Sequence, residues 1–87
     1  MSAEALAAKY IDAMEKTLRN TQRVKGAIVV SEARIDEIYG YVTTYLKDAK
    51  FFMEQKRFET SLTSIAYCEG LLDALKLIGA VKTKPAQ

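Results

Sequence analysis

Two acidic residues near the C-terminus, Glu69 and Asp73, are the first candidates for a chemical site in this sequence. They are four residues apart, so a helix would project both from one face, and Asp48 supplies a third carboxylate. Carboxylates without histidine hold a divalent ion weakly and through water. We therefore expect a structural role, with hydrogen bonds from Tyr41 and Tyr45 or salt bridges to basic residues of an earlier helix. A metal site is the less favoured alternative.

Gly70 lies between these two carboxylates, inside a segment with helical character. A glycine within a helix costs about 1 kcal/mol relative to alanine, which indicates a packing reason. We expect Gly70 to lie level with Thr43 and Thr44, so that two helix backbones approach closely. The alternative is a glycine that makes room for a ligand.

The residues that catalysis most often requires are missing from this sequence. It has no histidine, which removes the commonest general base and the commonest metal ligand. A single cysteine without histidine cannot form a Cys/His zinc site, and neither glycine-rich phosphate-binding motif occurs. Cys68 is one turn from Ile65 and Leu72, which favours a buried core thiol. We predict no enzymatic activity, no cofactor and no metal.

Three helices would position these residues, and the first is predicted from about Ala3 to Val24. Ser2 is its expected N-cap, and Lys25-Gly26 is its expected end. Its apolar residues recur at intervals of three and four, which predicts one buried stripe. The stripe consists of Ala7, Tyr10, Ile11, Met14 and Leu18.

The second helix begins after the N-cap Ser31, and apolar residues alternate at three and four along its whole length. They are Ile35, Ile38, Val42, Tyr45, Ala49 and Phe52. This pattern favours a partner helix that crosses at about +20°. A tight turn is predicted over residues 54–57, followed by a third helix from about Phe58 to Ile78 that Gly79 ends.

The predicted fold class is therefore all-α, a three-helix up-down-up bundle with short connections. We expect one domain over residues 1–80 and a frayed tail over residues 81–87. The apolar runs are far shorter than the ~20 residues that a membrane span needs, and we expect no secretory signal. The lone cysteine fits the reducing cytoplasm.

The segment YLKDAKFFMEQKRFETSLTSIAYCEGLLDALKLIGAV resembles a family of small archaeal proteins, the domain of unknown function 357. Its members carry a tyrosine, an Asp-Ala pair and a phenylalanine, then a short polar turn and a GLLDAL segment. The matching residues are Tyr45, Asp48, Ala49, Phe52, Tyr67, Gly70, Leu71, Leu72, Asp73, Ala74, Leu75 and Gly79. The resemblance covers residues 41–81, with Cys68 where alanine is more frequent and Lys56 where glycine is frequent. It implies a small three-helix bundle with no established activity.

The third helix carries more apolar surface than two neighbouring helices can cover. One exposed strip is predicted to consist of Leu71, Ala74 and Ile78. Surplus apolar surface on a small monomer usually marks a partner site. The leading hypothesis is a protein-interaction module, most simply a homodimer that forms through this face.

The alternative hypothesis is a weak nucleic-acid or anion-binding protein. In an up-down-up bundle, the end of the first helix, the start of the second and the end of the third share one basic pole. The candidate anion-binding residues at this pole are Lys16, Arg19, Arg23 and Lys25. The first three are expected on one helix face, at i, i+3 and i+7. A solvated basic rim beside helix C-termini is the favoured interpretation, because cations there interact well with the helix dipole.

Overall fold

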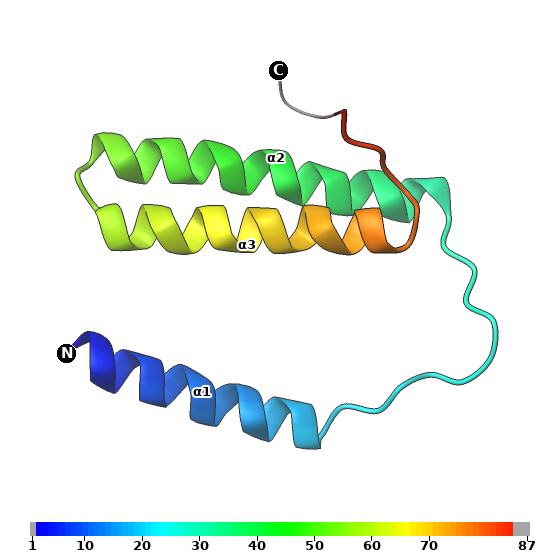
Figure 1. The fold of residues 1–87 in the computed structure, drawn as a ribbon, viewed down its shortest axis with the longest axis horizontal. Coiled ribbons are helices and arrows are strands. Elements are labelled where there is room, and N and C mark those ends of the chain that lie inside the picture. Colours follow the sequence, from blue (N-terminus) through cyan, green and yellow to red (C-terminus); the bar gives the residue numbers. More distant parts are fainter. Residues whose placement is uncertain (1, 85–87) are drawn as a thin grey trace.

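Residues 2–84 contain three helices, in the order that the sequence predicts. The structure is a computed structural model that describes residues 2–84. Helix α1 spans Ala3–Arg19, α2 spans Glu32–Glu54 and α3 spans Phe58–Leu77. They run up, down and up (Figure 1). The predicted all-α class and helix order are confirmed, and the described residues form no strand.

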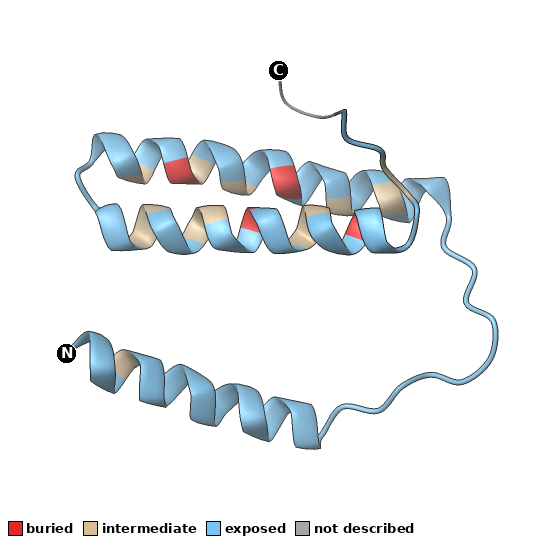
Figure 2. Ribbon diagram, in the orientation of Figure 1, coloured by how far each residue is buried: buried red, intermediate tan, exposed pale blue. Residues whose placement is uncertain are grey.

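Helices α2 and α3 form an antiparallel hairpin that holds the core. The buried residues among those described all lie between these two helices (Figure 2). They are Val42, Ala49, Cys68 and Leu75. In each helix the two buried residues are seven apart, which is the spacing of a coiled-coil seam. The six apolar residues predicted to form the α2 stripe are all buried or half-buried, so that prediction is confirmed.

Two hydrogen bonds from α3 to the backbone of α2 fix the register of the hairpin. The Ser61 hydroxyl donates to the Ala49 carbonyl at 2.7 Å, and the Cys68 thiol donates to the Val42 carbonyl at 3.2 Å. In both pairs the two residues are equally far in sequence from residue 55, which is therefore the centre of the turn. This register places Gly70 level with Gly40 rather than with Thr43 and Thr44, so the predicted levels were wrong by three to four residues, about one helical turn.

The turn between α2 and α3 lies where it was predicted, and Lys56 takes a conformation that favours glycine. Its φ is 60°, in the left-handed region. The Arg57 N–H donates to the Phe52 carbonyl and the Lys56 N–H to the Met53 carbonyl, which is the Schellman pattern. The Arg57 guanidinium also lies 4.9 Å from the centre of the Phe52 ring.

Helix α1 is shorter than predicted, and the connection after it is longer. The helix ends at Arg19, where the Asn20 amide donates to the Lys16 carbonyl and caps the last turn. Residues 21–31 then run without regular secondary structure to α2, whose N-cap Ser31 accepts from Arg34 N–H as predicted. The prediction of a short first connection and of an end at Lys25-Gly26 was therefore wrong.

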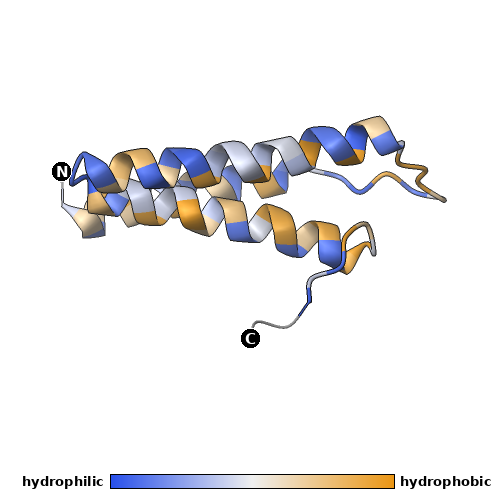
Figure 3. Ribbon diagram, turned by 90° about the horizontal axis from the view of Figure 1, so that it is seen from above, coloured by the Kyte–Doolittle hydropathy of each residue, from blue (hydrophilic) through white to orange (hydrophobic). Residues whose placement is uncertain are grey.

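Helix α1 stands apart from the hairpin, with its apolar side uncovered. No Cα atom of α1 lies within 8 Å of α2 or α3. The predicted buried stripe is open to solvent, and the exposed fraction is 65% for Tyr10, 62% for Met14 and 65% for Leu18. Figure 3 shows apolar residues, in orange, recurring along the helices. Burial of the stripe was the wrong inference, because periodicity identifies an apolar face but not what covers it.

The end of α3 follows the prediction. Gly79 has a φ of 76°, and the Ala80 N–H donates to the Leu75 carbonyl in a second Schellman pattern. Residues 81–84 have no regular secondary structure. Residues 85–87 of the predicted tail lie outside the described residues.

The seam predicts which leucine of α3 supports the fold. Leu75 is 1% exposed and Leu77 is 88% exposed, although they are two residues apart in one helix. Leu75→Ala should lower the free energy of unfolding by about 2–5 kcal/mol, because it removes a buried side chain and leaves a cavity. Leu77→Ala, the matched control, should change it by less than about 0.5 kcal/mol. Urea denaturation followed by circular dichroism measures both, and equal losses would contradict the seam.

The left-handed residue of the turn predicts a stabilising substitution. Lys56→Gly should raise the free energy of unfolding by about 0.5–1 kcal/mol, because relief of the ~1–2 kcal/mol left-handed strain outweighs the added freedom of the unfolded chain. Lys56→Ala removes the same charge but keeps a Cβ, so it should give no comparable gain. Thermal melts of the three proteins provide the comparison, and a gain in both variants would assign the effect to charge.

Candidate interaction surface

The acidic pair of α3 lies on the surface. Glu69 and Asp73 are both exposed on α3. The two tyrosines predicted to donate to them are engaged elsewhere. Tyr41 donates to the Glu37 carboxylate at 3.2 Å, and the ring centre of Tyr45 lies 4.5 Å from that of Tyr67. The predicted tyrosine–carboxylate pairs are therefore wrong, because the register differs from the predicted one.

The pKa of Tyr41 is raised above its ordinary value. The main cause is the hydrogen bond to Glu37, which the ionised phenolate would lose, and the repulsion between the two anions acts in the same direction. Arg34, which lies 3.0 Å from the Glu37 carboxylate, opposes the rise. The phenol thus stays neutral near pH 7, and its hydrogen bond is lost only as the pH rises through the raised pKa. At neutral pH, Tyr41 is therefore a neutral hydrogen-bond donor to Glu37.

The three candidate carboxylates do not converge. Asp48 is half-buried on α2, and the helical spacing places it on the side of the hairpin opposite to Glu69. Within residues 2–84, no three acidic or cysteine side chains come together in an arrangement suited to a metal ion.

Gly70 faces away from α2 and is exposed. A Cβ added at this position would meet nothing within 4 Å. The prediction that Gly70 allows close approach of α2 was therefore wrong. The close approach occurs instead at Ala49 and Ser61, where a side-chain hydroxyl reaches the opposite backbone.

One side of the hairpin carries an apolar groove that sequence reasoning missed. It is bordered by large apolar side chains that are between 39% and 70% exposed. They are Tyr39, Leu46 and Met53 of α2 with Phe58 and Leu62 of α3, and we call this surface the α2–α3 groove. A cleft of about 410 Å³, lined in part by Met53 and Ile65, lies along it. The sequence did carry a signal for this surface. Its α2 residues, Tyr39, Leu46 and Met53, recur every seven residues, and each lies four residues after a residue of the predicted α2 stripe.

The predicted interface strip is only partly open. Leu71 is half-buried on the side of the hairpin opposite the groove, while Ala74 and Ile78 are exposed. Ile78 is the C-cap of α3 rather than a helical residue. The strip is therefore smaller than the groove.

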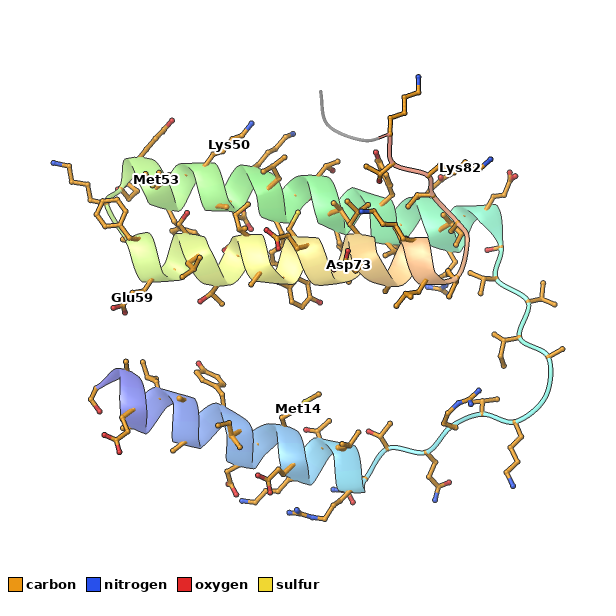
Figure 4. All side chains as sticks on the ribbon, viewed as in Figure 1. Met14, Lys50, Met53, Glu59, Asp73 and Lys82 are labelled. Atoms are coloured by element: carbon orange, nitrogen blue, oxygen red, sulfur yellow. The ribbon has the colours of Figure 1, made fainter. Side chains whose placement is uncertain are left out.

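A second apolar surface lies on α1 and faces α3. A cavity of about 770 Å³ separates the two helices. It is lined by Ala3, Leu6, Ala7 and Tyr10 of α1 and by Glu59, Thr60, Leu62 and Thr63 of α3. Figure 4 shows Met14 further along α1, on the same side of that helix. The chain thus presents two uncovered apolar surfaces, the α1 face and the α2–α3 groove.

The predicted anion-binding residues do not share a helix face. Lys16 forms an ion pair with Asp12 at 2.9 Å, and Arg19 is the last residue of α1. Arg23 and Lys25 lie beyond the helix, in the connection. The expected arrangement at i, i+3 and i+7 was wrong, because α1 ends before Arg23.

Comparison with family models identifies the chain. The model of the family described as a protein of unknown function, DUF357, matches residues 9–81. The chain belongs to this family. The match confirms the resemblance seen in the hairpin and extends it through the connection into α1. Comparisons with curated proteins and with solved structures gave no match. Along residues 2–84, no helix combines the length and the apolar character that crossing a membrane requires.

The open position of Gly70 reverses the expected effect of substituting it. Gly70→Ala should raise the free energy of unfolding by about 1 kcal/mol, because alanine is the better helix former and meets no neighbour here. Gly79→Ala is the matched control and should destabilise, because a Cβ is strained at its positive φ. Denaturation curves of both variants test this, and a loss with Gly70→Ala would place a packing partner over Gly70.

Proposed function

We propose that this DUF357 protein is a helical interaction module that associates with a second copy of itself and has no catalytic role. The observation that carries the proposal is its surplus of exposed surface. The chain of 9.7 kDa exposes 7957 Å². A compact monomer of this mass would expose about 5,100 Å². The radius of gyration is 16.0 Å, against about 12 Å for a compact domain of this length.

The surplus exceeds the area that a standard interface buries on each partner. It amounts to about 2,800 Å², whereas a standard protein interface buries about 800 Å² on each partner. Large apolar residues are exposed on both surfaces, the α1 face and the α2–α3 groove. Burial of apolar area stabilises association by roughly 25 cal/mol per Å², before the costs of association are subtracted. Two complementary apolar surfaces on one chain favour contact between copies.

The charges of α1 favour a protein partner over a nucleic acid or an anionic membrane. The helix carries three acidic and three basic residues, so its net charge is zero. Phosphate-binding and membrane-surface helices are instead rich in lysine and arginine. Mixed charges beside an apolar stripe are typical of helices that pack on other helices. The basic residues of the connection therefore remain a weaker basis for function than the apolar face of α1.

Light scattering across a concentration series should give the mass of a dimer. Met14→Asp should weaken the dimer by roughly thirtyfold, because about 2 kcal/mol is the cost of burying an unpaired polar group in an apolar contact. Ala5→Asp introduces the same charge on the opposite side of α1 and should leave the dimer intact. A monomer mass at every concentration would overturn the proposal. Equal effects of the two variants would exclude the apolar face of α1 from the interface.

A further inference from the structure

We draw no further inference here: the strongest candidate, the uncovered apolar face of α1 that lines the cavity between α1 and α3, carries nothing beyond the proposed self-association, because nothing in the structure shows what covers it.

Discussion

The structure depends on the close approach of α2 and α3 at small residues. The seam contains the small residues Ala49, Ser61 and Cys68. Because these side chains are small, the Ser61 hydroxyl and the Cys68 thiol reach backbone carbonyls of α2, at 2.7 Å and 3.2 Å. Each of these hydrogen bonds forms at only one alignment of α2 along α3. A shift of one helix by one residue along the other would break both bonds. The register then determines which residues are covered and which face outward. Gly70, the acidic pair and the groove all take their positions from it.

Features that depend on neighbouring residues in the sequence were predictable. The N-caps Ser2 and Ser31, the apolar stripe of α2 and the end of α3 at Gly79 follow from local geometry, and the structure has them all. The register of the hairpin was not predictable to within a turn, because Lys56 gives no sign of the left-handed conformation that it adopts. The end of α1 was placed too late for a related reason. Asn20 was the cap, but a glycine six residues further on was the stronger sequence signal.

The candidate site was less predictable than the fold, and the reason is physical. Amphipathic periodicity shows that α1 has a face to bury, but the same pattern serves a helix that packs on its own chain and one that packs on another copy. The polar candidates, Glu69 and Asp73, are simply exposed on α3. The groove was not recognised because Tyr39, Leu46 and Met53 of α2 form a plain apolar repeat in the sequence. Only the register of the hairpin shows that they lie on the same side as apolar residues of α3.

The distribution of charge explains why a chain with a net charge of +2 does not present a basic helical surface. Helix α2 has five acidic and three basic residues, and α3 has three acidic and one basic, so each carries a net charge of −2. The connection, the turn and the tail carry two basic residues each. Of these six cations, Lys56 follows directly after the C-terminus of α2, where a cation interacts favourably with the helix dipole. The hairpin is left acidic, and Glu69 and Asp73 are exposed on α3.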